Sequence, residues 1–483
     1  MQAISLHAPD ENRDLTEIEE KMTKYIVCGT LIDATGAEPA KGKAIVVEDD
    51  KIMSIVDAKN VPSGAEVIDL SDRTVLPGLI DSHEHLIVDI GDEEAQCSET
   101  IPYLAMKAMW NAKAILKAGI TTMRDVGERY FIDVDAKRCI EAGLIQGPRL
   151  LISGHPIIRT GGHAHFLGRE SDGVGDMRKA VREQLKRGVD LIKIMASGGM
   201  STKGSLPDSQ EFSDEEIFAC VDEARRNGRK VAAHLHGGPA LKVCIDAGVH
   251  SVEHGILYSE EDVKLVADSD TWLVFTTGVG QAAMESPDTP PHFVAKASAA
   301  QAKSLNVRKW AKQYGAKIAV GTDTYHGRMD VEAKALVEAG WTPMEALQVC
   351  TIKGAELCGL DGQLGTLEAG KLADIIALDG DPIADDAKLA GSPLVLQGHR
   401  TRCRVERTPE PLVERSTRID RDPDDRLSDR RPDPMQTVAR CCCSGGDDLA
   451  NDPLLSVYGW SVDPSGNKAP DEEHRDHQND TLR

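Results

Sequence analysis

The sequence predicts an α/β fold, a (β/α)8 TIM barrel with a small β domain built from both flanks of the barrel. Between residues 76 and 360, eight short apolar runs alternate with amphipathic helical stretches, which is the pattern of a parallel sheet with crossover helices. Strand-like runs also occur before and after this region. A doubly wound open sheet is the alternative that the strand pattern alone leaves open.

The composition narrows the class of protein. The 483 residues suffice for a barrel of ~250 residues and a smaller domain. A net charge of −23 argues against nucleic acid, since phosphate binding needs clustered Lys and Arg. No apolar run approaches the ~20 residues that cross a bilayer, and the first residues lack the apolar region of a signal peptide. We therefore expect a soluble, cytoplasmic homo-oligomer that acts on a small molecule, with no membrane or nucleic-acid partner.

The eleven cysteines do not suggest a disulfide framework. Most are scattered through apolar surroundings, so we expect small buried hydrophobic side chains. Cys441, Cys442 and Cys443 are contiguous and cannot easily converge on one ion, and we assign them no role.

The β domain is expected at both ends of the barrel. Residues 1–22 are a polar extension, and residues 361–400 are β-like again and can pair with the first β zone, although the sequence leaves their completeness open. Residues 401–483 are rich in charge and proline and poor in large apolar groups, so we expect disorder there. In residues 23–75 the expected strands are Tyr25–Cys28, Ala44–Glu48, Ile52–Val56 and Glu66–Leu70.

The barrel is assigned to residues 76–360. Two of its helices begin with capping boxes, Ser213 with Glu216 and Thr342 with Glu345, and Pro343 suits the first helical position. Its expected strands are Val75–Ile80, Thr121–Arg124, Arg149–Ser153, Leu191–Met195, Val231–Ala233, Ser251–Glu253, Trp272–Phe275 and Lys317–Val320.

The segment Leu76–Leu86 is the first candidate for chemistry. It places His83 and His85 one residue apart at the end of a buried strand. Side chains of a strand alternate between its faces, so both imidazoles can reach one point in space. Imidazole is a common metal ligand, and the pair therefore indicates a metal site at the mouth of the barrel.

Four further side chains fall at or near the carboxyl ends of expected strands. A lysine inside the run Leu191–Met195 is costly to bury as an ammonium. It either snorkels to an edge or reacts with carbon dioxide to form an anionic carbamate that can bridge two cations. An aspartate after the last strand could cap a helix, or bind metal and accept a proton from water. The four are Lys193, His234, His254 and Asp323, and together with His83 and His85 they predict a site for two divalent metal ions. His236, two residues after His234, would lie behind these ligands or face the substrate.

These motifs resemble those of the metal-dependent amidohydrolase superfamily over about residues 24–385. The resemblance implies a distorted (β/α)8 barrel with a β-sandwich built from both flanks. It also implies zinc as the metal. One ion would be held by His83, His85 and Asp323, the other by His234 and His254, with a carbamate on Lys193 between them. The matching segments are Pro77–His85, Lys193–Gly199, His234–Gly237, Val252–Gly255, Gly321–Asp323 and Gly370–Ile376.

Within the superfamily, the sequence is similar to the branch of Xaa-Pro dipeptidases, related carboxypeptidases, ochratoxin amidase and imidazolonepropionase-like amidohydrolases. The run that begins at Lys193 and the loop Thr160–His163 carry this similarity. It implies that a hydroxide between the metals cleaves an amide or peptide bond of a small carboxylate-bearing substrate. His163 would polarise the scissile carbonyl, and Asp323 would carry the proton to the leaving amine. Lys193 argues against imidazolonepropionases themselves, which typically lack it.

A substrate carboxylate would need a cationic or phenolic partner in the strand-end loops. The candidates by position are Arg159, Tyr325, His326 and Arg328, each of which could equally be a solvated loop residue. Cyclic-amide hydrolysis or deamination on the same fold, and a non-catalytic scaffold, stay open as alternatives. The resemblance is poorest after Ile383, where Leu394–Leu396 is the candidate for a closing strand.

Overall fold

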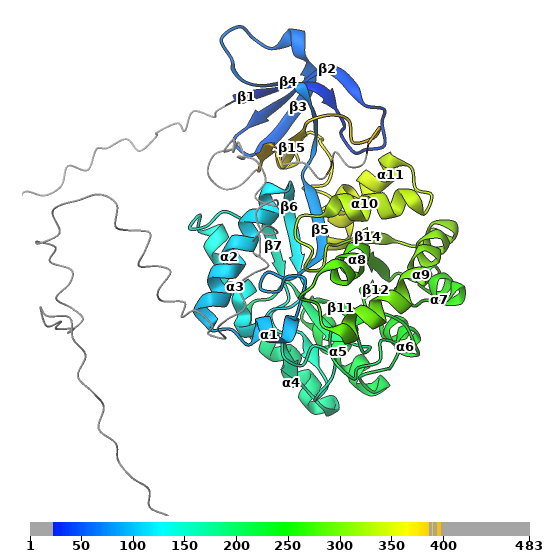
Figure 1. Cartoon of the computed structure of the whole chain (residues 1–483). Coiled ribbons are helices and arrows are strands. Elements are labelled where there is room, and N and C mark those ends of the chain that lie inside the picture. Colours follow the sequence, from blue (N-terminus) through cyan, green and yellow to red (C-terminus); the bar gives the residue numbers. More distant parts are fainter. Residues whose placement is uncertain (1–22, 386–388, 390–393, 398–483) are drawn as a thin grey trace, which may run out of the picture. The chain divides into compact units, whose positions relative to one another are not determined.

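The computed structural model describes residues 23–385, 389 and 394–397 (Figure 1). The expectations for residues 1–22, for the tail at 401–483 and for its three adjacent cysteines lie outside the described residues. The described strands form hydrogen-bonded sheets of six, seven and three strands. The six-stranded sheet comes from the two ends of the described chain, and the other two come from its middle.

The six-stranded sheet joins segments from both flanks. β15 pairs antiparallel with the end of β4, where Ile375 faces Pro77. Ile26, Val75 and Ile375 are buried in one apolar cluster, which packs the two flanks together. All six strands belong to one sheet, and the two-sheet sandwich stays a prediction. In the order β16-β15-β4-β1-β2-β3, the strands are β16 (Leu394–Leu396), β15 (Ile375–Leu378), β4 (Glu66–Pro77), β1 (Thr23–Leu31), β2 (Ala40–Glu48) and β3 (Lys51–Asp57).

The middle of the chain consists of short parallel strands, so the predicted α/β class is confirmed. One sheet has the order β5-β6-β7 and the other β14-β13-β12-β11-β10-β8-β9. The strands are β5 (Leu79–Glu84), β6 (Ile120–Asp125), β7 (Arg149–Ile152), β8 (Ile157–Ile158), β9 (Arg169–Glu170), β10 (Leu191–Met195), β11 (Lys230–Leu235), β12 (Ser251–His254), β13 (Trp272–Phe275) and β14 (Ile318–Val320).

Two strand predictions need correction. The expected strand at 75–80 is divided at Gly78, so its two parts belong to β4 and β5. Gly78 lies so close to Thr121 that a Cβ added to it would be 2.1 Å from the Oγ1 of Thr121. The expected strand at 149–153 ends at Ile152, and the chain bends at Gly154 (φ 68°) before continuing as β8. Its first part pairs with β6 and its second with β10, so the bend divides the parallel strands into two sheets.

The edges of the two parallel sheets approach each other at both sides. The N–H of Asp323, just after β14, donates to the carbonyl of His83 on β5 at 2.9 Å. A Cβ at Gly321 would lie 2.4 Å from the nitrogen of His83, so glycine allows this close approach. On the other side, the N–H of Asp190 donates to the carbonyl of Ile152 at 2.8 Å.

Helices surround the parallel strands (Figure 1). The capping boxes predicted at Ser213 and Thr342 are present, and a third, which sequence analysis missed, starts at Ser259. The helices are α1 (Glu93–Cys97), α2 (Ile101–Lys117), α3 (Ile132–Glu141), α4 (Gly173–Arg187), α5 (Asp214–Arg226), α6 (Ala240–Ala247), α7 (Glu260–Ala267), α8 (Thr277–Glu285), α9 (Pro291–Tyr314), α10 (Met329–Glu338), α11 (Pro343–Gln348) and α12 (Gly354–Cys358), with short turns η1 (Ala58–Asn60), η2 (Arg129–Phe131) and η3 (Val349–Lys353).

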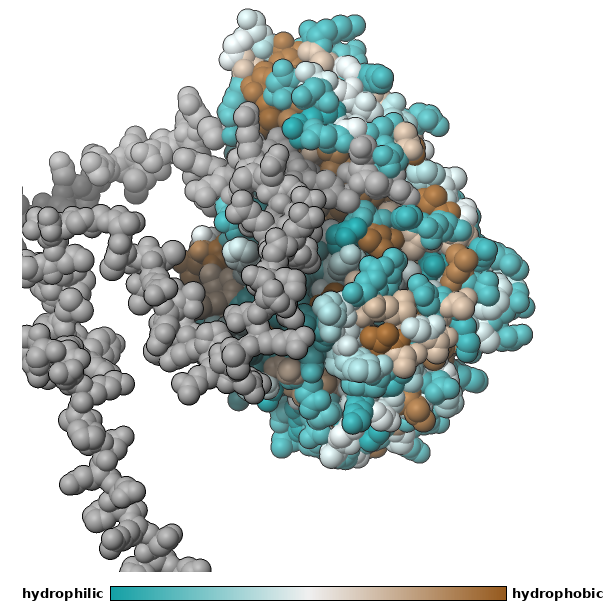
Figure 2. Space-filling model, viewed as in Figure 1, coloured by the Kyte–Doolittle hydropathy of each residue, from teal (hydrophilic) through white to brown (hydrophobic). Residues whose placement is uncertain are grey.

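Hydrophilic residues cover most of the described surface seen in Figure 2, and apolar ones gather over α2, where Tyr103, Met106 and Trp110 are exposed. Among the described helices, none has the length and apolar character needed to cross a bilayer. The described cysteines are free thiols and five of the seven are buried, as expected for small apolar side chains.

Candidate metal centre

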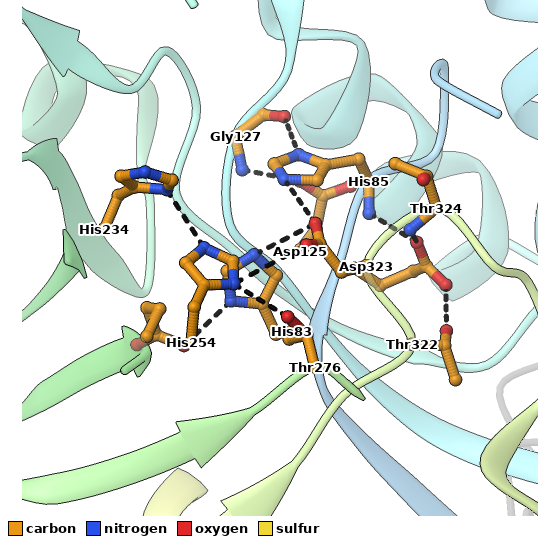
Figure 3. A network of polar contacts seen from close by, with 12 residues as sticks. His83, His85, Asp125, Gly127, His234, His254, Thr276, Thr322, Asp323 and Thr324 are labelled. Atoms are coloured by element: carbon orange, nitrogen blue, oxygen red, sulfur yellow. Dashed lines mark hydrogen bonds and ion pairs between the residues drawn. The ribbon is translucent and has the colours of Figure 1, made fainter. Parts of the chain in front are cut away.

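His83 and His85 project from the end of β5 toward Asp323 (Figure 3). The Nε2 atoms of His83 and His85 lie 3.3 and 3.7 Å from Asp323 Oδ1. The ligand atoms of the three side chains lie within 4.8 Å of one another. The structure therefore brings Asp323 together with two histidines that precede it by about 240 residues, and all three are of metal-binding type.

Two carboxylates on β5 hold the loop that carries Asp323. Asp81 accepts hydrogen bonds from the N–H of Thr322 at 3.1 Å and from its hydroxyl at 2.6 Å. Glu84 accepts one from the N–H of Thr324 at 2.7 Å. Asp323 and Thr324 have positive φ angles of 48° and 75°. Such a conformation costs about 1–3 kcal/mol per residue, and the buried hydrogen bonds offset this cost.

Hydrogen bonds at the second ring nitrogen orient both histidines. His83 Nδ1 lies 2.8 Å from Glu253 Oε2, which also accepts from Arg124 Nη2 at 2.8 Å. His85 Nδ1 donates to the carbonyl of Gly127 at 2.7 Å. Each Nε2 is thereby left to face Asp323. Sequence analysis missed Glu253 and Arg124, whose only signal was a charged residue within an expected strand.

The protonation states suit metal binding. Burial lowers the pKa of His85 to about 4, so its imidazole is neutral at pH 7. Burial opposes ionisation of Asp323, but the neighbouring His83 and His85 bring its pKa below the usual range. Burial raises the pKa of Glu253 as well, and Arg124 outweighs this effect and holds it at about 2. Neutral imidazole and ionised carboxylate are the forms that coordinate a metal ion.

His234 and His254 form a second pair, at the ends of β11 and β12. His234 Nδ1 lies 2.9 Å from His254 Nε2. His254 Nδ1 lies 2.7 Å from Thr276 Oγ1 and 3.6 Å from Asp323 Oδ2, so this pair borders the first group (Figure 3). Burial lowers the pKa of both histidines well below its usual value, which keeps them neutral.

The spacing of the donor atoms tests whether these side chains fit a metal ion. Ligands at ~2.1 Å from a tetrahedral ion lie roughly 3.4 Å apart. The distances from His83 and His85 to Asp323, 3.3 and 3.7 Å, match this spacing. The 2.9 Å between His234 and His254 is shorter, so these rings would have to separate by roughly half an ångström. The first group fits an ion as it stands, and the second fits one after a small ring movement.

Lys193 lies in the middle of β10, is 1% exposed, and lines the same cavity as the histidines. Among the described residues, no hydrogen bond reaches its Nζ. Burial lowers the pKa of Lys193 to about 8, and Glu253 and Asp323 limit this shift. An appreciable fraction of the amine is therefore neutral near pH 8, as reaction with carbon dioxide requires.

Two further histidines lie beside His234. The ring of His163 is 4.4 Å from it between centroids, and His163 Nδ1 lies 3.1 Å from Thr202 Oγ1. A Cβ at Gly199 would lie 2.2 Å from His163 Nε2, so glycine leaves room for this imidazole. The ring of His236 is 4.6 Å from that of His234, and its buried Nδ1 has no hydrogen-bond partner among the described residues. Both histidines line the cavity.

The loop residues expected near a substrate carboxylate have partners within the protein. Arg159 forms an ion pair with Glu211. Arg328 donates from Nη1 to the Tyr325 hydroxyl and from Nη2 to Asp330, both at 2.8 Å. None of the three candidates belongs to the described lining of the cavity.

His326 is also engaged away from the cavity. Its Nδ1 lies 3.2 Å from Glu84 and its Nε2 lies 2.8 Å from Asp89. Burial lowers the pKa of His326, but the two carboxylates outweigh this and raise it to about 10. As a partly buried cation, His326 ties the loop after β14 to β5.

A second group of metal-binding type, His85 with Asp125 and Glu128, lies around the same histidine. Burial raises the pKa of both carboxyl groups, helped by repulsion from Asp133 at Asp125 and from Asp125 and Asp133 at Glu128. Asp125 accepts from the N–H of Gly127 at 3.0 Å, and Glu128 accepts from that of Ile87 at 3.2 Å. Through these hydrogen bonds, both carboxyl groups support the backbone around His85.

A cavity of about 960 Å³, including space open to solvent, lies over the candidate ligands. Two charged residues that sequence analysis missed, Glu93 and Arg308, also line it. Much of the remaining lining is apolar and includes Val88, Leu167, Ile256, Phe275 and Phe293. The cavity can thus hold a small molecule with apolar and charged parts.

Comparisons with known proteins agree with this geometry. Residues 74–398 match the profile described as Amidohydrolase family. An ochratoxinase of Aspergillus niger is 29% identical over 426 residues, which cover 79% of this chain and 86% of the relative. Among solved structures, a Xaa-Pro dipeptidase with bound methionine is 31% identical with a TM-score of 0.72, over 78% of this chain and 98% of that one. A prolidase complexed with N-methylphosphonate-L-proline is 28% identical with a TM-score of 0.73, over 79% and 100%.

Proposed function

We propose that this chain uses two divalent metal ions, zinc by expectation, to cleave the amide or peptide bond of a small carboxylate-bearing substrate. The chain belongs to the amidohydrolase family and is an enzyme that hydrolyses carbon–nitrogen bonds. His83, His85 and Asp323 would hold one ion. His234 and His254 would hold the other, with a carbamate on Lys193 between them. The similarity to an ochratoxinase and to Xaa-Pro dipeptidases supports an amide or peptide substrate.

The single observation that carries the proposal is the convergence of ligand atoms on one cavity. His83, His85 and Asp323 meet at distances that suit one metal ion, and His254 lies 3.6 Å from the same aspartate. A buried lysine without a hydrogen bond among the described residues lines the same space.

The chain's own residues have distinct roles in the proposed reaction. Bound divalent metal would polarise the substrate carbonyl and lower the pKa of water for attack. His163, beside His234, would donate a hydrogen bond to the carbonyl oxygen. Asp323 would take a proton from the attacking water and carry it to the leaving amine. His236 would contact the substrate from the same wall.

The proposal includes a structural frame for this site. The two parallel sheets would be arcs of one (β/α)8 barrel at 76–360, supported by the backbone hydrogen bonds at both of their edges. Residues 23–75 and 361–400 would form the β-sandwich, 1–22 a polar extension and 401–483 a tail. Cytoplasmic location and homo-oligomerisation stay predictions.

The test combines metal analysis with substrate profiling. We expect about two zinc ions per purified chain and hydrolysis of N-acyl amino acids or Xaa-Pro dipeptides. Lys193→Ala should lose at least one ion and most of the activity. Lys179→Ala, at a lysine whose side chain is 68% exposed, is the matched control and should change neither. Less than one metal ion per chain together with a fully active Lys193→Ala variant would exclude the proposal.

The same assay separates the alternatives. Ammonia release from a heterocyclic substrate, without cleavage of any acyclic amide, would indicate a deaminase. Ring opening of a cyclic amide would indicate a cyclic-amide hydrolase. A chain that binds neither metal nor substrate would be a scaffold.

A further inference from the structure

Arg308 is a buried cation in the wall of the candidate active site. It lies on α9, is 5% exposed, and lines the cavity that holds His85, His254 and Lys193. Among the described lining residues, Arg308 and Lys193 are the only lysine or arginine side chains. A lysine that becomes a carbamate is an anion, so Arg308 would then be the one arginine or lysine cation of this lining.

The guanidinium is held in place by neutral groups only. Its Nε donates to the carbonyl of Ala335 at 3.2 Å, and Nη1 donates to the hydroxyls of Thr277 at 3.1 Å and Ser304 at 3.3 Å. In the described part of the chain, Nη2 has no hydrogen bond and the side chain forms no ion pair. Three directional bonds fix the orientation of the planar group, and one edge stays available.

The carboxyl group of Glu332 is not a full counter-ion for the Arg308 guanidinium. Glu332 accepts a hydrogen bond from the N–H of Gly278 at 2.6 Å and affects Arg308 electrostatically without forming an ion pair. Burial raises the pKa of Glu332 to about 7, so it is only partly charged at neutral pH. Since an unpaired buried charge is costly, the arrangement around Arg308 favours an anion supplied by a ligand.

The start of α8 adds a second, weaker attraction for an anion. Thr276, Thr277, Val279 and Gly280, at its amino-terminal end, all line the cavity. The Thr276 side chain does not cap the helix, because its hydroxyl bonds to His254. The first N–H groups of a helix have no intrahelical acceptor and carry a partial positive charge. In α8, Glu332 already accepts a hydrogen bond from the N–H of Gly278, so only part of this attraction is left for a ligand. The cavity therefore presents a fixed guanidinium and a helix amino terminus on neighbouring elements.

We propose that Arg308 and the first turn of α8 form the subsite that binds the carboxylate of the substrate. The proposal rests on the proposed function and specifies it. A planar guanidinium is the side chain best matched to a carboxylate. The adjacent apolar lining, with Phe275, Phe293 and Val307, suits a large apolar side chain. The favoured substrate is thus an N-acyl derivative of an apolar amino acid with a free carboxylate.

The test compares two probes that differ only in this charge. N-benzoyl-L-phenylalanine and its carboxamide are assayed by benzoate release, with wild type, Arg308→Met and Arg308→Lys. For the acid, Arg308→Met should lower kcat/KM by on the order of 100-fold, mainly through KM. For the carboxamide the change should stay within about threefold, and Arg308→Lys should restore part of the loss. Arg182→Met, at an exposed arginine on α4, is the control and should match wild type on both probes.

The outcomes are distinct from those of the proposed function. Equal losses on acid and carboxamide, or no loss, would overturn the subsite, as would a wild type that does not prefer the acid. If Arg308→Met does not fold, the ratio of kcat/KM for the acid to that for the carboxamide, measured with Arg308→Lys, decides whether the subsite exists. If the wild type cleaves neither probe, calorimetric binding of the same pair decides. A preference for the acid of at least about tenfold that Arg308→Met abolishes would support the subsite, and equal or absent binding would overturn it.

Discussion

The two halves of the candidate metal centre are braced by different chemistry. Behind His83 stands the buried ion pair of Glu253 and Arg124, with 2.8 Å from His83 Nδ1 to the carboxylate. Behind His234 and His254 stand a carbonyl and a hydroxyl, at 3.2 and 2.7 Å. Hydrogen bonds that involve a charged group are roughly twice as strong as neutral ones. His85 is held by the carbonyl of Gly127, so the charged support acts at His83, and we expect it to make the half on β5 the more rigid of the two.

The donor distances follow the same division. The distances around Asp323 already suit a metal ion, whereas the facing nitrogens of His234 and His254 lie 2.9 Å apart and would have to separate. A rigid half would fix the position of one proposed ion, and an adjustable half could follow changes at the proposed carbamate on Lys193. Damage to the two halves should thus have unequal effects on metal binding, activity and stability.

Asp323 belongs to both halves, because one oxygen faces His83 and His85 and the other faces His254. Asp323→Asn should lower kcat/KM by about 10³-fold or more, since it removes a residue proposed both to bind metal and to carry the proton. Activity and metal content of the purified variant test this. Asp246→Asn, at an exposed aspartate, serves as control. Retention of both metal and activity would remove Asp323 from the centre.

Glu253→Gln should have the next largest effect, and it should fall on the β5 half. It leaves the Arg124 guanidinium buried without its counter-ion, which costs about 3–5 kcal/mol of the free energy of unfolding. It also loosens the orientation of His83, which should weaken metal affinity by about 10–100-fold. Denaturant unfolding and metal titration measure the two effects. An unchanged free energy of unfolding would show that the ion pair of Glu253 and Arg124 contributes little to stability.

The sequence predicts the grouping of His83, His85 and Asp323 because each position depends on a local pattern. Strand alternation places the two histidines on one face, and the end of an apolar run marks the aspartate. Glu253 and Arg124 could not be paired in this way, because their contact depends on which strands lie across from each other. Charged residues within two expected strands were the only signal.

The substrate side of the cavity was less predictable than the metal side. Arg159, Tyr325 and Arg328 were chosen for their place in strand-end loops, yet the structure gives them partners within the protein. Arg308 lies on a helix and reaches the cavity only through the packing of α9 on its neighbours. A helical sequence does not reveal which of its buried arginines will face a cavity, so tertiary structure was needed.

The rigid half should also respond to pH through His326, which lies between Glu84 and Asp89. Burial lowers the pKa of His326, but these carboxylates raise it to about 10. Since this exceeds the unfolded value of ~6.5, the stabilisation is complete below about pH 6.5 and is lost as pH rises toward the folded value. The difference in unfolding free energy between wild type and His326→Gln should shrink by about 1–3 kcal/mol from about pH 6 to about pH 9. Denaturant unfolding at several pH values measures it, and a constant difference would contradict the assignment.

Thr276→Val should have the smallest effect, because it removes a neutral brace from the adjustable half. The hydroxyl at 2.7 Å from His254 Nδ1 is lost, while the shape of the side chain is nearly kept and α8 loses no cap. We expect a loss of about 1 kcal/mol in the free energy of unfolding. Affinity for one of the two proposed metal ions should fall by no more than about tenfold, the lower end of the range for such partners. Metal titrations of Thr276→Val and Glu253→Gln, carried out side by side, compare the metal affinities of the two variants directly. Equal losses in the two variants would mean that charge does not distinguish the halves, and that their ring spacings differ for another reason.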